Sequence, residues 1–401
     1  MRALLGRRDV RLLLAGQTLS MFGDWALIIV LGIWAKVLTG SNSAAGLVFF
    51  VFALASLVAP VGGVIVDRLP KRPLMIATHV ALAGVVCLLL FVQDRSDLWL
   101  LYLVTALYGL GGDLFGAARA AMLKAMLPDE QLGEANGLLQ SVREGLRLVA
   151  PLVGAGIYAA AGGAAVAILD AATFLGSAAM LVVLPFAEPA TAPREHHLLR
   201  EASTGLTHIA RTRILRELTI GLGAGLLVAG FTETLIFAIT SESLHRPPSF
   251  IGVLSSFEGA GAIAGGLTGA ALLRRLGDLR LTGVGLAVFG VASALLLLPS
   301  LAAVLAASAV AGLGIVWAIV ALATAYQRRS PSEMQGRVAA AANMLFSVPQ
   351  TISIAAGAAL IAVIDFRVEL VIVAGVLLLA SAYLLTRRGD DEAHGVEPAI
   401  A

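Results

Sequence analysis

The sequence predicts an all-helical integral membrane protein with twelve transmembrane helices arranged in two halves. A very apolar composition, apolar stretches of membrane-spanning length and an internal repeat support this fold class. Hydrophobic residues make up 59% of the 401 residues and charged residues 13%, with a mean hydropathy of +0.91, unlike a soluble domain. A helix needs about 20 apolar residues to cross about 30 Å of hydrocarbon. The predicted spans are residues 12–39, 43–66, 74–92, 97–121, 135–160, 163–186, 214–241, 249–273, 280–298, 301–326, 336–361 and 367–386.

The distribution of cations predicts the orientation in the membrane. Lys and Arg are enriched in the cytoplasmic loops of membrane proteins. If both termini are cytoplasmic, the outer loops hold only four of the 28 Lys and Arg residues, namely Lys36, Arg95, Arg246 and Arg367. We therefore expect an even number of spans and both termini in the cytoplasm.

A polar segment in the middle of the chain predicts the division into domains. Residues 1–186 form the first six-helix bundle, residues 187–213 a cytoplasmic linker, residues 214–386 the second bundle and residues 387–401 a cytoplasmic tail. Two prolines break the start of the linker. The stretch after them could form a short amphipathic helix on the inner membrane surface.

An internal repeat relates the two halves. A shift of 203 residues aligns them without gaps across spans two, four and five. Parallel repeats of six helices are typical of one class of secondary transporters, in which the substrate site lies between the halves near the middle of the bilayer. The aligned pairs are Gly62 with Gly265, Gly63 with Gly266, Lys71 with Arg274, Arg72 with Arg275, Gly109 with Gly312, Gly111 with Gly314, Pro128 with Pro331, Glu130 with Glu333, Gly133 with Gly336, and Gly154 with Gly357.

The loop after span two carries a family resemblance. The segment "GVIVDRLPKR" resembles the signature of the major facilitator superfamily, although Pro70 stands where the family usually has glycine. The resemblance implies a latch that closes the cytoplasmic side. Inside-positive topology alone explains the cations, so the latch depends on Asp67, whose counterpart in the second repeat is Ala270. The matching residues of this gate motif are Gly63, Asp67, Arg68, Lys71 and Arg72.

Other segments resemble one branch of that superfamily, the proton-driven macrolide exporters. They are "AGQTLSMFGDWAL", "FGAARAAMLKAMLPDEQLGEANGLLQSVREGLRLVAPLVGAGI" and "SPSEMQGRVAAAANMLFSVPQ". This branch also resembles exporters of siderophores, and "FGDWAL" is similar to a segment of lysophospholipid transporters. In span five, Pro151 and Gly154 form a helix-packing motif that resembles the antiporter signature, which favours export over uptake.

Charged residues inside the spans are the candidates for the coupling site. A charge at mid-membrane costs at least about 2.5–3.5 kcal/mol, so such residues should face a cavity or a partner. Counted from the inner ends, Asp113 and Arg143 lie about 12–14 Å deep, and Asp24 and Arg147 about 20 Å deep, which would allow two acid–base pairs. The candidates for substrate and proton coupling are Asp24, Asp113, Arg143, Glu144, Arg147 and Glu258.

Two interpretations of this cluster stay open at the level of the sequence. The charges could form a structural ion network that holds spans four and five together. Alternatively, one carboxyl exchanges an arginine partner for a proton, and proton uptake then competes with a cationic or polar substrate. Asp24 is the first choice for this acid, and Trp25 beside it is the expected wall of the substrate site. Asp170 fits a water-filled cleft and a cap on a backbone gap equally well.

The sequence therefore predicts a proton-coupled exporter of a small amphipathic compound, such as a drug or a secreted metabolite, in the bacterial inner membrane. Sodium is the alternative coupling ion, and a siderophore or a lysophospholipid is the alternative substrate. We expect a monomer in the lipid bilayer without a cofactor, a metal or a nucleic-acid partner. No catalytic motif or phosphate-binding loop is present outside the spans, which argues against an enzyme. A receptor of the same fold that does not transport is a further alternative.

Overall fold

The computed structural model describes residues 6–57, 66, 68–186, 198–331 and 334–387. Within these ranges the secondary structure is helical, and no strand occurs. The chain forms two compact units, which are described separately here. Unit 1 comprises residues 1–196 and 245–256, and unit 2 comprises residues 197–244 and 257–401. The first residues of the predicted span eight therefore group with the N-terminal half.

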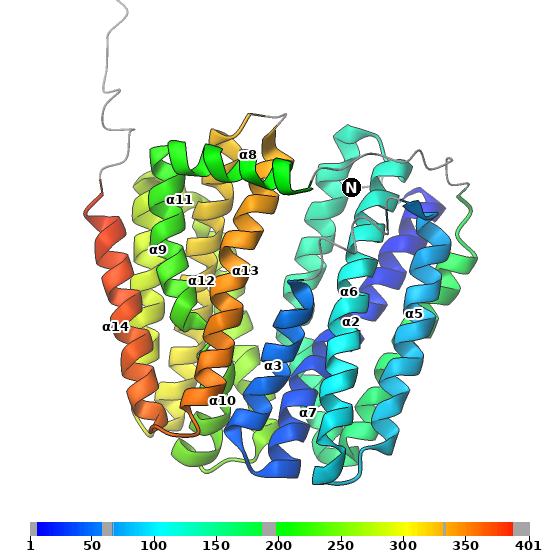
Figure 1. Ribbon diagram of the computed structural model, residues 1–401, viewed down its shortest axis with the longest axis horizontal. Helices are drawn as coiled ribbons and strands as arrows, with labels where there is room; N and C mark the ends of the chain where they lie inside the picture. The colour runs from blue at the N-terminus through cyan, green and yellow to red at the C-terminus, as the bar shows by residue number, and fades with distance from the viewer. Residues whose placement is uncertain (1–5, 58–65, 67, 187–197, 332–333, 388–401) are drawn as a thin grey trace, which may run out of the picture. The chain divides into compact units, whose positions relative to one another are not determined.

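In the described part of unit 1, three helix contacts dominate the packing: α2 lies against α7, and α5 lies against both α6 and α7. Gly162, with a φ of 79°, interrupts α7, close to the predicted boundary between spans five and six. The helices are α2 (Arg8–Thr39), α3 (Asn42–Ser56), α5 (Lys71–Cys87), α6 (Leu98–Met126) and α7 (Asp129–Val182), labelled in Figure 1.

Unit 2 begins with a surface helix, α8, which packs against α13 and α9 and lies across their ends in Figure 1. Gly277, with a φ of 75°, interrupts α11 between the predicted spans eight and nine. The helices are α8 (Leu198–Arg211), α9 (Arg213–Ala229), α10 (Thr232–Ala238), α11 (Ile251–Leu295), α12 (Leu301–Arg329), α13 (Gln335–Leu360) and α14 (Phe366–Leu385).

Nine helices in the described part of the chain are long and apolar enough to cross a membrane. Two of them, Glu134–Val182 and Pro248–Leu295, contain the glycine breaks and each covers two predicted spans. Asn42–Ser56 is apolar but shorter, and residues 58–65 of the predicted second span lie outside the described residues. The all-helical membrane fold is therefore confirmed, whereas the count of twelve stays a prediction.

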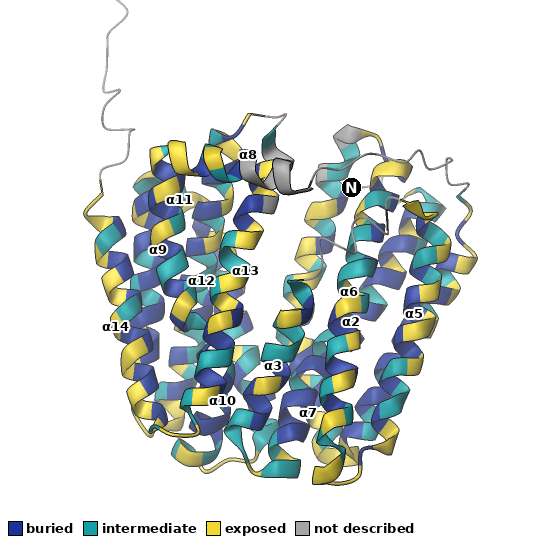
Figure 2. Ribbon diagram, in the orientation of Figure 1, coloured by how far each residue is buried: buried dark blue, intermediate teal, exposed yellow. Residues whose placement is uncertain are grey.

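The surface of the helices is suited to lipid. Large apolar side chains are exposed on many of them, including Leu267 at 81%, Leu379 at 72% and Phe91 at 68%. Figure 2 shows such exposed positions along the length of α14 and α5. A soluble protein rarely exposes apolar patches of this extent, so the exposed surface agrees with a multi-pass membrane protein.

The sequence repeat is also a repeat of helix contacts. In unit 1, a Cβ atom on Gly109 of α6 would lie 2.9 Å from the Cβ of Ala55 near the end of α3. In unit 2, a Cβ atom on Gly312 of α12 would overlap the carbonyl oxygen of Glu258 in α11. Ala55 and Glu258 are themselves related by the 203-residue shift. The aligned glycines thus allow the same pair of helices to approach closely in both units.

The last aligned glycines make a second equivalent contact. A Cβ atom on Gly154 of α7 would lie 2.5 Å from the carbonyl oxygen of Ala26 and 2.9 Å from its Cα. A Cβ atom on Gly357 of α13 would lie 2.8 Å from the Cα of Phe231. In each unit, the glycine brings the helix close to the first long helical segment of its own half, which explains why this position lacks a side chain in both copies.

Candidate functional site

A hydrogen bond between two helices defines the centre of the candidate site. The α2 helix carries Asp24 about midway along its length, and α6 carries Tyr108. The hydroxyl of Tyr108 donates to Oδ1 of Asp24 at 2.6 Å. Tyr108 is 5% exposed, and a buried tyrosine hydroxyl generally requires such a partner. Asp24 is half-buried as a residue.

A second acid lies beside this pair. Asp170 of α7 is fully buried, and its Oδ2 has no hydrogen-bond partner among the described residues. The hydroxyl of Thr173 lies 2.7 Å from the carbonyl oxygen of Asp170 and 3.3 Å from Oδ1. The carboxyl groups of Asp170 and Asp24 interact electrostatically. The Asp24–Tyr108–Asp170 cluster therefore places two like-charged groups around one hydroxyl.

The glycine before Asp24 makes this arrangement possible. A Cβ atom on Gly23 would overlap Oδ1 of Asp170 and Oγ1 of Thr173, and it would lie 3.2 Å from the Cα of Asp170. Only a residue without a side chain allows α7 to bring its carboxyl so close to α2. In the "FGDW" sequence, the glycine that lets α7 approach α2 is thus followed directly by the acid of the cluster.

One arginine provides the positive charge near the cluster. Arg119 of α6 is half-buried and interacts electrostatically with Asp24 and with Arg143. The sequence analysis missed this residue because it lies near the inner end of its span, where a cation is expected from topology alone. It also left the role of Asp170 undecided and did not consider Tyr108, because pairing between α2, α6 and α7 is not readable from one chain.

Aromatic rings surround the polar cluster. The Tyr108 ring centroid lies 6.0 Å from that of Phe174 and 6.2 Å from that of Phe52. His79, which is 1% exposed, stacks on Phe115 at 3.7 Å and lies 5.0 Å from Phe174. These rings exclude water from one side of the acids, which strengthens electrostatic interactions there.

The acid–base pairs suggested by matching depth do not form among the described residues. Asp113 interacts with the hydroxyl of Ser56, and exposed Arg143 interacts with Arg119. The guanidinium of Arg147 lies 6.0 Å from the ring centroid of Trp25. Depth along a span carries no information on which face of each helix a residue occupies, so it does not determine which residues pair. Trp25 accordingly contacts a cation of its own unit, and its role as a substrate wall stays a prediction.

The two remaining coupling candidates lie in different surroundings. Glu144 accepts a hydrogen bond of 2.8 Å from Nε2 of Gln140, one turn earlier on the same helix. Glu258 belongs to unit 2 and is half-buried, and its backbone carbonyl forms the close contact with Gly312 described above. A role in coupling stays a prediction for both residues.

The gate motif is described in part. Arg72 donates to the carbonyl oxygens of Leu181 at 2.8 Å, Val182 at 2.5 Å and Phe186 at 3.4 Å, so it caps the end of α7. The ammonium of Lys71 donates to the carbonyl oxygen of Leu69 at 2.8 Å, and Arg68 is exposed. Gly63 and Asp67 lie outside the described residues, and the latch stays a prediction. Pro151 and Gly154 of the helix-packing motif are both buried in α7.

Unit 2 contains buried acids that the sequence analysis overlooked. Glu369, in the first turn of α14, is fully buried, and neither of its carboxyl oxygens has a hydrogen-bond partner among the described residues. Glu217 accepts a hydrogen bond from the hydroxyl of Tyr383. Asp278, next to the Gly277 break, forms an ion pair with Arg329. Unit 2 thus contains buried carboxyl groups that the apolar character of its sequence does not predict.

No group of three or more His, Cys, Asp or Glu side chains in the described part of the chain is arranged to hold a metal ion. The polar cluster of unit 1 contains two carboxyls and a phenol, groups that are able to bind a proton or a cation.

Comparisons with known proteins agree with this architecture. A sequence model of the family described as Major Facilitator Superfamily matches residues 13–239 and 222–400. An uncharacterized MFS-type transporter of Bacillus subtilis strain 168, YfiS, is 27% identical over 263 residues, which cover 64% of this chain and 62% of that protein. The chain thus spans less than two thirds of the length of this relative.

Solved structures with the same fold include two types of transporter. The chain is similar to a bacterial homologue of the iron transporter ferroportin in its inward-facing state, with a TM-score of 0.73, 17% identity and coverage of 96% of this chain and 100% of the other. It is also similar to a POT family transporter in complex with a thioalcohol-conjugated peptide, with a TM-score of 0.74, 12% identity and coverage of 93% and 94%. At these identities the likeness concerns the fold.

Proposed function

Because the chain belongs to the Major Facilitator Superfamily, we propose that it is a secondary transporter that exports a small amphipathic compound in exchange for protons. The observation that carries the proposal is the cluster of Asp24, Tyr108 and Asp170 within unit 1. The inside-positive loops support a location in the bacterial inner membrane with both termini in the cytoplasm.

The geometry of the two carboxyls supports proton binding. When both are charged they repel each other, and among the described residues only the hydroxyls of Tyr108 and Thr173 lie within hydrogen-bond distance of them as donors. Arg119 balances one negative charge. A buried charge without a partner is costly, so the pair is best satisfied when it shares one proton. The cluster therefore offers a site at which a proton is bound and released.

The difference in burial assigns the two acids different tasks. Asp170 has no exposed surface, so a substrate cannot reach it without rearrangement of the helices. Asp24 is partly exposed, and its second carboxyl oxygen can meet a cation that enters the site. A cationic compound at Asp24 would replace the proton, and a proton would later replace the compound. This competition is the basis of antiport.

The surroundings favour an amphipathic substrate. The rings of Phe52 and Phe174 flank Tyr108, and an aromatic face attracts both apolar groups and cations. A drug-like cation or a secreted metabolite with a ring and a basic group fits this chemistry. A siderophore or a lysophospholipid is the alternative substrate, and sodium is the alternative ion.

The proposal is tested by efflux from inverted membrane vesicles with an imposed pH gradient. Uptake of an amphipathic cation such as ethidium into the vesicles should require the gradient and stop when a protonophore collapses it. If a sodium gradient alone sustains transport, sodium replaces the proton. Substrate binding without any flux in proteoliposomes would indicate a receptor, and transport that is indifferent to both gradients would contradict the proposal.

Comparison of the variants Asp24→Asn and Asp94→Asn tests whether coupled transport depends on the Asp24 carboxyl or on negative charge in general. Asp24→Asn should abolish coupled transport of the cation. Asp94 lies in an exposed loop, where two hydrogen bonds from Ser96 hold the pKa of its carboxyl below the usual value. Because asparagine caps a helix about as well as aspartate, Asp94→Asn removes one surface charge and should transport normally. Equal activity of the two variants would remove Asp24 from the mechanism.

A further inference from the structure

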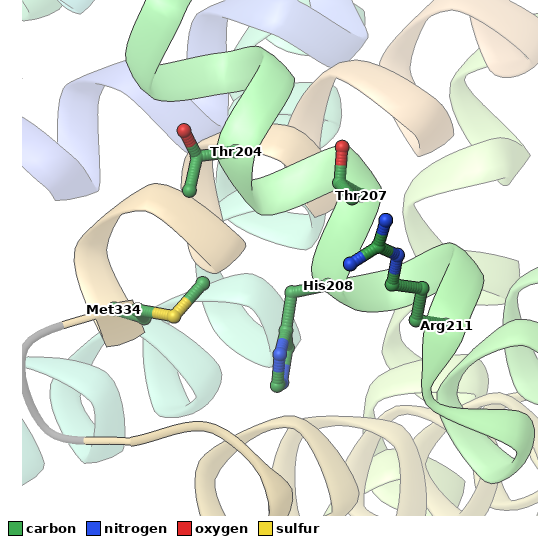
Figure 3. A pocket seen from close by; sticks show the side chains of 5 residues that line it. All are labelled: Thr204, Thr207, His208, Arg211 and Met334. Atoms are coloured by element: carbon green, nitrogen blue, oxygen red, sulfur yellow. The ribbon is translucent and has the colours of Figure 1, made fainter.

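The surface helix α8 carries a polar pocket that the proposed transport cycle does not use. The pocket has a volume of about 380 Å³ and is lined by Thr204, Thr207, His208, Arg211 and Met334. Four of these residues recur at helical spacing and therefore share one face of α8. Met334 comes from the chain just before α13. Figure 3 shows the Arg211 guanidinium turned back along α8, with Met334 on the opposite wall.

We propose that this pocket binds a phosphate group, and that the ligand in the cell is the headgroup of an anionic phospholipid. Arg211 is exposed and forms no ion pair among the described residues. A guanidinium binds two phosphate oxygens at once through its fork of N–H donors. Thr204 and Thr207 add a hydroxyl group each to the lining of the pocket, and a hydroxyl is a possible hydrogen-bond donor to an anion.

The contact of His208 determines which ring atom faces the ligand. Its Nε2 lies 3.0 Å from the carbonyl oxygen of Arg329, and because a carbonyl only accepts, Nε2 carries the proton in this contact. The other nitrogen, Nδ1, is then left for the ligand. A ring that carries both protons donates Nδ1–H to a phosphate oxygen, which adds a second cationic donor to Arg211.

The positive charge around the pocket favours an anionic ligand over a cationic one. Arg213 and Arg216 follow Arg211 in the next turn of chain, whereas the nearest described acid in the sequence, Glu217, already contacts Tyr383 and Arg387. A cation therefore finds no acidic side chain among the described residues that line the pocket. The segment around the pocket is strongly basic, and the linker that contains α8 is predicted to lie at the inner membrane surface. Both features favour the headgroup of an anionic lipid.

The pocket is connected through hydrogen bonds and an ion pair to the glycine break in α11. His208 contacts the backbone of Arg329, and the Arg329 side chain pairs with Asp278, the residue after the Gly277 break in α11. Gly205 adds a direct contact, because a Cβ atom there would overlap the carbonyl oxygen of Arg337 in α13. A phosphate between α8 and Met334 would therefore strengthen the attachment of α8 to α12 and α13.

The binding test uses the full-length protein purified in a neutral detergent and does not depend on transport. Dioctanoyl phosphatidylglycerol, dioctanoyl phosphatidylcholine and inorganic phosphate are titrated separately at constant ionic strength, and the melting temperature is followed. Ligands that bind the folded state raise it in a saturable manner. Phosphatidylglycerol should stabilise the protein at least tenfold more effectively, by apparent affinity, than phosphatidylcholine.

Variants distinguish the pocket from general surface charge. Arg211→Gln should weaken the apparent affinity for phosphatidylglycerol about tenfold, as expected for the loss of charge-assisted hydrogen bonds. Arg275→Ala removes one exposed cation of the same unit that does not line the pocket and should bind like the wild type. If Arg211→Gln does not fold, Thr207→Val provides a milder change of the same pocket.

The pattern of responses also identifies the source of the phosphate. Saturation by inorganic phosphate with the same dependence on Arg211 would support the phosphate site and assign it to a soluble phosphoester. Equal responses to both lipids, or equal responses of Arg211→Gln and Arg275→Ala, would overturn the proposal. Failure of the proton-gradient experiment would leave this result unaffected, because binding is measured without transport.

Discussion

Tyr108 donates a hydrogen bond to Asp24, a residue 84 positions earlier in the chain. The bond connects the first helix of unit 1 with a helix three spans later in the unit, and it lies next to the fully buried Asp170. A neutral donor between two carboxyls can stabilise whichever of them is charged. The phenol is therefore the element of the cluster whose removal changes coupling without changing any formal charge.

We expect Tyr108→Phe to retain the fold and to reduce proton-coupled efflux about tenfold, because a hydrogen bond to a charged group contributes about 1.5–3 kcal/mol. The phenyl ring keeps the contacts with Phe52 and Phe174, so the melting temperature should fall by no more than the loss of this one hydrogen bond explains. Efflux from inverted vesicles measures the effect. Tyr102→Phe is the matched control, since its hydroxyl donates to the carbonyl oxygen of Ala44, and an equal loss of efflux there would contradict the assignment.

Gly23→Ala should impair transport more than stability. The new methyl group would collide with the end of the Asp170 side chain and with Thr173, so the carboxyl must rotate away from Asp24. Overpacking of this kind costs about 1–3 kcal/mol. Gly112→Ala in α6 meets open space, and a helical Gly→Ala change of that sort stabilises by about 0.5–1 kcal/mol. Efflux and melting temperature of the two variants are compared, and normal efflux by Gly23→Ala would contradict the geometry of the cluster.

The sequence predicted the class of this fold well because the length and hydropathy of the apolar stretches and the internal repeat are read directly from the order of residues. The repeat even anticipated structure: Gly109 and Gly312 make equivalent contacts, although no composition argument distinguishes them from other glycines. The site was harder. Asp24 was selected from its depth, and depth alone also allowed a pair with Arg147, whereas the structure places Tyr108 and Arg119 near its carboxyl. Which face of a helix a residue occupies depends on packing against other helices, and one sequence carries little of that information.

Gly154→Ala tests whether the aligned glycines hold the first helix of each half. The methyl group would press on the backbone of Ala26, with contacts of 2.5 and 2.9 Å, and backbone cannot rotate away as a side chain can. The free energy of unfolding should fall by about 1–3 kcal/mol. Gly156→Ala, two residues later, meets open space and should be neutral or stabilising. Equal melting temperatures of the two variants would contradict the close approach of α7 to α2.

Variants of the gate motif can distinguish a cation that stabilises the fold, Arg72, from one that is exposed, Arg68. Arg72 caps the end of α7 through three carbonyl oxygens, so Arg72→Ala should lower the free energy of unfolding by about 1.5–3 kcal/mol, the contribution of a hydrogen bond to a charged group. Arg72→Lys should recover only part of this loss, because an ammonium lacks the planar fork that reaches several acceptors. Thermal unfolding of purified protein measures both.

Arg68→Ala provides the control for this prediction, since Arg68 belongs to the same motif but is exposed. Its unfolding should match the wild type, and any effect should appear only in turnover. If Arg68→Ala destabilises the protein as much as Arg72→Ala, the motif acts through its overall charge and not through the cap. If neither variant alters stability, the contacts of Arg72 with α7 contribute nothing measurable to it. The basic pair that both repeats share is then explained by topology alone, as Lys71 and Arg72 in the first copy and Arg274 and Arg275 in the second.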